Sequence, residues 1–261
     1  MKIMRPDEIY VKQASAEFDL MCQLKIDSVV NYHDFNPDAE WTQKDGKKVK
    51  CCYLVMERVQ GVELLEFLNE MKDTDEQLVR TIGLKVLKAI HELHRSGIFH
   101  ADIKLENIMI TTDYQIKIID MSYSKSLANG DGSGYFTTQR GTQMYMAPEV
   151  FLKNETYQGQ DADLFAFGVL VLVLMLQDYP WEDFTNKRYK LLTCNGGAFS
   201  DEFWALFKDV EISDEFKTLI EGMLALDPSS RPTLADVLAS DWMRGPTITD
   251  DQFAKIGDPI I

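Results

Sequence analysis

The sequence has few cysteines and no pairing pattern among them. Its 261 residues contain only Cys22, Cys51, Cys52 and Cys194, and these form no C-x-x-C pair of the kind that binds zinc or carries redox chemistry. The first residues, MKIMRPDE, lack the apolar core of a secretory signal. Because disulfide frameworks belong to oxidising compartments, these absences predict a reducing, cytoplasmic location.

Long hydrophobic runs are also missing. The longest one, 164–176, covers 13 residues, whereas a helix that crosses a bilayer needs about 20. We therefore interpret it as a helix buried on all sides within a protein core, and we expect no membrane segment.

Basic residues are scarce relative to acidic ones. Lys and Arg number 27 against 42 Asp and Glu, which gives a net charge of −15. This balance repels phosphate backbones, and no basic stripe is visible, so we expect no nucleic-acid partner. Composition alone does not indicate the oligomeric state.

Hydrophobic periodicity divides the chain into a small mixed part and a larger helical part. A helical spacing over 14–25 precedes strand-like runs over 29–35 and 50–56, and the polar segment 36–48 between those runs is expected to be a solvated loop. The irregular stretch 121–146 has a length that is usually functional. The other expected elements are a helix over 75–95, strands over 107–110 and 115–120, and helices over 161–177, about 185–193, 213–225 and 233–243.

The segment HADIKLENIMI, residues 100–110, places polar groups directly before an apolar strand. Asp102 can accept a proton or bind a metal, Lys104 offers a mobile positive charge, and Asn107 offers a neutral oxygen. Asp120 ends the next apolar strand. Hard oxygen ligands beside an ammonium group suit Mg²⁺ and phosphate better than zinc. A single such residue would be read as a turn former or a solvated charge, but four beside two strands indicate phosphate chemistry.

Five short motifs follow one another in a fixed order. Residues 100–107 look like the catalytic loop H-R-D-x-K-x-x-N of protein kinases, 120–122 stand where that family has D-F-G, and 147–149 match A-P-E. Residues 163–168 resemble D-x-W-S-x-G, and 227–233 resemble the late segment whose Arg pairs with the Glu of A-P-E. This ordered set resembles the catalytic domain of eukaryotic protein kinases, and Lys104 in D-x-K resembles the serine/threonine type.

The resemblance implies an α+β, bilobal protein-kinase-like fold. Residues 1–59 would form a partial small, ATP-binding β lobe that lacks the Gly-rich hairpin. Residues 60–245 would form the mainly helical large lobe with the catalytic loop and the activation segment, and 246–261 a short tail.

The same resemblance implies transfer of the γ-phosphate of ATP to Ser or Thr hydroxyls of protein substrates, with Mg²⁺. Asp102 would orient the hydroxyl and accept its proton, and Lys104 would neutralise charge on the transferring group. Asn107 and Asp120 would hold the metal ions. Phosphoryl transfer depends on positioning and charge stabilisation, so this set is sufficient for it.

A nucleotide site is implied by the segment 50–68. Met56 would lie at the back of the adenine pocket, and Met109 would form its floor, although ordinary core packing also explains both. Backbone groups of Glu57 and Val59 would meet the adenine edge, with Glu63 near the ribose.

Two residues near the N-terminus complete the implied nucleotide site. Residues 1–4 look like the tail of the A-x-K strand, which makes Lys2 the lysine of the α- and β-phosphates. Glu17 fits its partner on the small-lobe helix.

The family pattern is broken in three places. No G-x-G-x-x-G hairpin occurs, which predicts either a fragment of a longer kinase or a catalytically weak protein. Ala101 replaces the Arg that commonly pairs with a phosphorylated activation-loop residue, so we expect activity largely independent of phosphorylation at Thr137 or Thr138. Met121 and Ser122 replace Phe and Gly of D-F-G. These departures leave open the alternative of an inactive pseudokinase that acts as a binding or scaffold module.

Two residue pairs have spacings that could indicate other chemistry. His91 and His94 have the spacing of a metal pair but no third ligand nearby, so a structural role is preferred. Cys51 and Cys52 lie on an expected strand, which predicts that one thiol faces the core and the other faces solvent.

Overall fold

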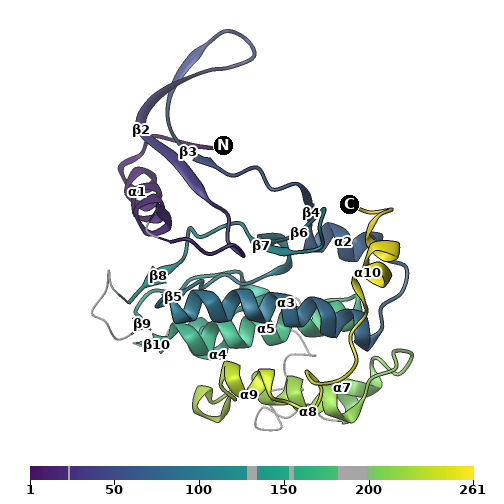
Figure 1. Cartoon of the computed structure of the whole chain (residues 1–261). Helices are drawn as coiled ribbons and strands as arrows, with labels where there is room; N and C mark the ends of the chain where they lie inside the picture. Colours follow the sequence, from purple (N-terminus) through teal and green to yellow (C-terminus); the bar gives the residue numbers. More distant parts are fainter. Residues whose placement is uncertain (23, 128–133, 153–155, 182–198, 200) are drawn as a thin grey trace.

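The computed structural model describes residues 1–22, 24–127, 134–152, 156–181, 199 and 201–261 (Figure 1). The helix expected over about 185–193 lies outside these residues, as does part of the irregular stretch 121–146.

A three-stranded antiparallel sheet with one helix forms the N-terminal part (Figure 1). The strand order is β1 (Lys2–Met4), β3 (Lys48–Met56) and β2 (Tyr32–Thr42). Helix α1 (Glu8–Cys22) lies beside the sheet and buries one face, which includes Ala14, Leu20 and Met21 and also the carboxylate residue Glu17. A charged residue on the buried face of a helix is costly unless it is paired, which directs attention to its neighbours.

The composition of the polar segment 36–48 predicts a solvated loop, and this prediction is wrong. The segment belongs to a long hairpin in which β2 pairs with β3 as far as Thr42 and Lys48, and residues 43–47 form the turn. Cross-strand ion pairs, Lys48 to Glu40 at 3.2 Å and Lys50 to Asp38 at 2.7 Å, join its exposed strands. With both faces in solvent this hairpin has no apolar alternation, so the period-two signal is missing.

The expectation for the vicinal cysteines was also wrong, because both side chains are buried. Cys51 is 4% exposed and Cys52 is 0% exposed. The Sγ of Cys52 donates to the Arg5 carbonyl at 3.5 Å, under the chain that joins β1 to α1. The strand therefore has cover on both faces at this point.

The C-terminal part is mainly helical, with short strands at the junction (Figure 1). A second antiparallel sheet has the order β4 (Gly61–Glu63), β6 (Ile108–Thr111) and β7 (Ile116–Ile118). Two further strand pairs are β5 (Ile98–Phe99) with β8 (Lys125–Ser126), and β9 (Tyr135–Phe136) with β10 (Tyr157–Gln158). The described helices are α2 (Leu64–Glu70), α3 (Glu76–Arg95), α4 (Pro148–Phe151), α5 (Gly159–Leu176), α7 (Asp201–Ala205), α8 (Asp214–Met223), α9 (Leu234–Leu238) and α10 (Asp250–Gly257), with single 3₁₀ turns at Leu105–Asn107, Gln143–Tyr145 and Pro228–Ser230.

Helix α5 is the centre of the larger core. It packs against α3 and α8, and its apolar run is buried on every side, as its composition indicated. By length and composition α5 could cross a membrane, but 89% of its 18 residues are buried inside the fold.

A buried ion pair joins distant parts of the helical unit. Arg231 donates to both carboxylate oxygens of Glu149, at 2.7 and 2.8 Å, and the two side chains are 1% and 5% exposed. The pairing implied by the motifs at 147–149 and 227–233 is therefore confirmed. Removal of one partner from such a pair typically costs about 3–5 kcal/mol, because the other charge stays buried.

The segment 246–261, expected to be a short tail, contains helix α10 and packs on the fold. Thr249 and Gln252 form a capping box at its start. The ring of Phe253 is 1% exposed and meets Phe67 edge-on at 5.9 Å and Tyr114 at 5.3 Å. This segment therefore contributes to the core, whereas the boundaries predicted at 59/60 and 245/246 stay predictions.

Candidate active site

Helix α5 fixes the loop that carries Asp102. The carboxylate of Asp163, near the start of α5, accepts the backbone N–H groups of His100 at 2.8 Å and Ala101 at 2.7 Å. His94 Nε2 contacts the same carboxylate at 2.9 Å, which gives this ring the structural role preferred over metal binding. Ala101 has a φ of 62°, in the left-handed region, so these bonds hold a backbone turn that costs energy.

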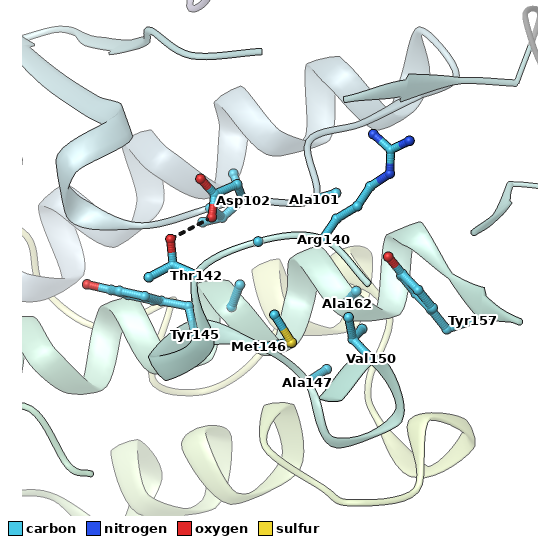
Figure 2. Close-up of a pocket in the computed structure, with 13 residues that line it drawn as sticks. Ala101, Asp102, Arg140, Thr142, Tyr145, Met146, Ala147, Val150, Tyr157 and Ala162 are labelled. Carbon is cyan, nitrogen blue, oxygen red and sulfur yellow. Dashed lines mark hydrogen bonds between the residues drawn. The ribbon is translucent and has the colours of Figure 1, made fainter. Parts of the chain in front are cut away.

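Both oxygens of the Asp102 carboxylate have partners. Asn107 Nδ2 donates to Oδ2 at 3.0 Å and to the Asp102 carbonyl at 2.8 Å. The Lys104 ammonium lies 3.1 Å from Oδ2. Thr142 Oγ1 donates to Oδ1 at 2.8 Å (Figure 2) and accepts from Lys104 Nζ at 2.8 Å. The structure thus brings together three predicted residues and one, Thr142, that sequence reasoning missed.

Asn107 and Asp120 are placed by adjacent pieces of backbone. The N–H of Ile119 donates to the Asn107 carbonyl at 3.0 Å, which joins the loop before β6 to the end of β7. Because the amide nitrogen of Asn107 is bound by Asp102, its Oδ1 is directed elsewhere. The two predicted metal ligands therefore come from neighbouring loops.

Lys2 contacts two carboxylates from different elements. Its Nζ lies 3.3 Å from Asp120 Oδ1 and 3.5 Å from Glu17 Oε2. Burial alone would raise the pKa of Asp120, but the Lys2 charge and hydrogen bonds from Ser122 hold it below its ordinary value. Burial raises the pKa of Glu17, only partly opposed by Lys2 and by a hydrogen bond from Tyr32. Lys2 and Tyr32 therefore offset part of the cost of burying the Glu17 carboxylate.

Tyr32 is a second site residue that the sequence did not reveal. Its hydroxyl donates to Glu17 Oε1 from the first position of β2, and its side chain is 8% exposed. Burial and the Glu17 charge raise the pKa of this phenol, whereas a hydrogen bond with the Met121 backbone lowers it. One buried hydroxyl thus links α1 to the segment that follows Asp120. In the sequence Tyr32 reads only as an apolar strand position.

The residues expected around adenine lie near the end of β3 and the start of β6. Met56, Val59 and Met109 are half-buried, and Met109 pairs with the exposed Glu63 across β4 and β6. The N–H of Glu57 donates to the Asn31 carbonyl at 2.8 Å. Of its two backbone groups, only the carbonyl of Glu57 can face a ligand.

The donor chemistry fits a magnesium–nucleotide complex better than a metal cage. Among the described residues no group of three or more His, Cys, Asp and Glu side chains is close enough to hold a metal. Asn107 and Asp120 offer one amide and one carboxylate oxygen. Mg²⁺ is commonly bound in this way, with one or two protein oxygens and the remaining positions filled by phosphates and water.

Comparison with known proteins defines the class. Residues 1–243 match the protein-family model described as protein kinase domain. The chain therefore belongs to the protein kinase family, and its bilobal α+β fold is the one expected.

Similar proteins are named as serine/threonine kinases. The cell cycle serine/threonine-protein kinase CDC5/MSD2 of Saccharomyces cerevisiae is 31% identical over 194 residues, 74% of this chain and 26% of that protein. The probable serine/threonine-protein kinase fhkC of Dictyostelium discoideum is 33% identical, over 74% of this chain and 32% of that protein. The serine/threonine-protein kinase cds1 of Schizosaccharomyces pombe is 31% identical, over 87% and 46%. The chain thus spans less than half of each of these relatives.

Proposed function

We propose that this chain is a serine/threonine protein kinase domain that transfers the γ-phosphate of ATP to protein hydroxyls with Mg²⁺. One observation carries the proposal: the Lys2 ammonium lies within 3.5 Å of both Glu17 and Asp120, which come from α1 and from the segment after β7. A lysine held between two carboxylates is available to nucleotide phosphates in a fixed position. The kinase relatives support the same activity.

Asp102 is the group that would meet the substrate hydroxyl. Its hydrogen bonds from Asn107 and Thr142 fix the carboxylate plane. An oriented carboxylate can align a Ser or Thr hydroxyl and accept its proton as the oxygen attacks phosphorus. Lys104, 3.1 Å from the same carboxylate, would balance charge on the transferring phosphoryl group.

Asn107 and Asp120 would hold magnesium, with Lys2 on the α- and β-phosphates. Bound Mg²⁺ would neutralise charge on the β- and γ-phosphates. The low pKa of Asp120 keeps that ligand ionised at neutral pH. Met56, Val59 and Met109 would contact adenine, with the Glu57 carbonyl at its edge and Glu63 beside the ribose.

We also propose that the protein acts in a reducing, cytoplasmic compartment. Its partners there would be proteins rather than nucleic acids. The three described cysteines are free thiols, and two of them, Cys51 and Cys52, are buried. The net charge of −15 opposes binding to polyphosphate surfaces.

The first test is Mg²⁺-dependent stabilisation by ATP. We expect the parent chain to gain about 2.7 kcal/mol of unfolding free energy at a hundredfold excess of Mg·ATP over its Kd. Asp120→Asn should lose most of this gain, whereas the control Asp241→Asn, at a distant exposed position, should keep it. Asp102→Asn should still bind Mg·ATP but lose phosphoryl transfer to a Ser/Thr peptide mixture. A parent chain that shows no Mg·ATP stabilisation would instead support the scaffold alternative.

A further inference from the structure

Arg140 joins two stretches of chain that flank the proposed active site. Its Nη1 donates to the Tyr123 carbonyl at 3.0 Å, three residues after Asp120. Its Nε donates to Thr138 Oγ1 at 3.1 Å, and the guanidinium lies 5.7 Å from the centre of the Phe136 ring. One side chain thus ties the segment after Asp120 to the segment that leads into Thr142.

The residues after Arg140 continue this connection to the catalytic loop. Gly141 has a φ of 98°, and a Cβ at this position would lie 2.7 Å from the Ala101 carbonyl oxygen, so the two backbones touch. Thr142 then bonds both Asp102 and Lys104, each at 2.8 Å. Residues 140–142 therefore form a continuous bridge from the Tyr123 carbonyl to the Asp102 carboxylate.

The residue before Asp102 contributes no cation to the contacts that Arg140 makes. The residue before Asp102 is Ala101, which lines the same cavity as Arg140 and lies beside it (Figure 2). A methyl group cannot reach the Tyr123 carbonyl or the Thr138 hydroxyl. Another cation, Lys125, donates to the Tyr135 carbonyl and lies 5.2 Å from the centre of the Phe136 ring, so its contacts are with β9 rather than with residues 138–142.

We propose that Arg140 is a positioning residue for the phosphoryl transfer proposed above. By holding residues 121–124 against 136–142, it keeps Asp120 in register with Asp102 through Thr142. The guanidinium fork suits this task because it donates in two directions at once. The connection is made by an uncharged Thr138 hydroxyl and a backbone carbonyl, so it does not require a phosphate.

The kinetic test compares two Arg140 variants with a matched arginine elsewhere. We expect Arg140→Ala to lower kcat about ten- to a hundredfold and to change KM for ATP less than about threefold, because misplacing a reacting group lowers the rate of the chemical step. Arg140→Lys keeps the charge but not the fork, and should recover only part of kcat. Arg244→Ala, at an exposed side chain 66% accessible, should match the parent.

If the bridge needs no phosphate, removing the two hydroxyls that could be phosphorylated, those of Thr137 and Thr138, should leave it intact. Thr137→Ala combined with Thr138→Ala should keep kcat within about threefold of the parent, since the Tyr123 bond and the Gly141 contact remain. A loss beyond tenfold in this double variant, with Arg140→Ala close to the parent, would overturn the proposal.

Amide hydrogen exchange tests, independently of catalysis, whether Arg140 holds the two segments together. Amides in 121–124 and 138–142 should exchange faster in Arg140→Ala than in the parent, and Arg244→Ala should change neither segment. If Arg140→Ala does not fold, Arg140→Lys gives the same comparison. Parent-like exchange in both segments together with parent-like kcat excludes the role of Arg140. A parent chain that fails to bind Mg·ATP refutes the proposed function, while the exchange result still reports on the bridge.

Discussion

At the scale of single residues, the site depends on which groups stabilise buried charge. Glu17 is 5% exposed, and burial pushes its pKa upward. Two donors, the Lys2 ammonium and the Tyr32 hydroxyl, partly oppose this shift because both interact with the carboxylate anion. Lys2 is only partly buried, and its ammonium is shared between Glu17 and Asp120. The Tyr32 hydroxyl, in contrast, donates to Glu17.

The change Tyr32→Phe tests this hydroxyl. It keeps the ring in the core but leaves one carboxylate oxygen of Glu17 without its donor, a loss of about 1.5–3 kcal/mol for a hydrogen bond to a charged group. We expect Mg·ATP to bind about tenfold more weakly, because Glu17 no longer fixes Lys2. Calorimetric titration measures the Kd, and Tyr10→Phe on the exposed face of α1 is the control. Equal affinities in both variants would assign Tyr32 a packing role alone.

At the scale of elements, the junction between the first sheet and β7 is an ionic one. The Glu57 carboxylate at the end of β3 accepts from Lys117 on β7 at 2.8 Å and from the Asn31 backbone and side-chain nitrogens at 3.1 and 2.9 Å. Burial alone would raise the pKa of Glu57, but these hydrogen bonds outweigh it and hold the pKa below its ordinary value. The junction therefore stabilises the fold only while Glu57 is ionised.

This junction has a defined pH dependence. Because the pKa of Glu57 is lower in the folded chain, its contribution is complete above the unfolded value of 4.5 and is lost as pH falls through the folded value. We expect Glu57→Gln to lower the unfolding free energy by about 1–2 kcal/mol at pH 7, and by progressively less as the pH falls below about 4. Urea unfolding of this variant and of Glu70→Gln, an exposed control on α2, measures the difference. A penalty that does not shrink in acid would contradict the assignment.

At the scale of the whole molecule, the chain carries a large excess of acidic residues over basic ones. The net charge of −15 produces a negative field that attracts basic segments over about a Debye length, roughly 10 Å at 0.1 M salt. The field acts on encounter rather than on the chemical step.

Salt should therefore distinguish substrates by their charge. For a Lys/Arg-rich Ser/Thr peptide we expect kcat/KM to fall about five- to tenfold between 0.05 and 0.5 M NaCl, with kcat nearly constant. An Asp/Glu-rich peptide of the same length should show the opposite trend. Steady-state assays at constant free Mg²⁺ measure both. Identical salt responses would mean that local groups, and not the overall field, control encounter.

Local sequence predicted the helical core well, because its signals are strong and redundant. The run 164–176 is apolar at every position and became α5, and the helix expected over 75–95 is α3 (Glu76–Arg95). Prediction failed where the signal depends on a partner strand. The hairpin over 36–48 is polar on both faces, so composition indicated a loop.

The same distinction holds for the candidate site. The sequence by itself predicted Asp102, Lys104 and Asn107, because these unlike polar groups lie within a few residues of one another. It predicted Asp120 because this carboxylate ends the next apolar strand. Lys2 and Glu17 could be assigned only by their register to later motifs. The fold then placed both beside Asp120, while their roles and the nucleotide contacts stay predictions.

What the sequence determined is the family, because its signature lies in short contiguous motifs, and the same motifs predict the set of reacting groups. What the tertiary structure decided is which residues support those groups: Tyr32 beside Glu17, Thr142 beside Asp102, and Arg140 between Tyr123 and Thr138. Supporting residues act through side-chain contacts between segments far apart in the chain. Such contacts have no local pattern, because the chemistry of a phenol or a guanidinium acquires its role only when folding places it next to a partner.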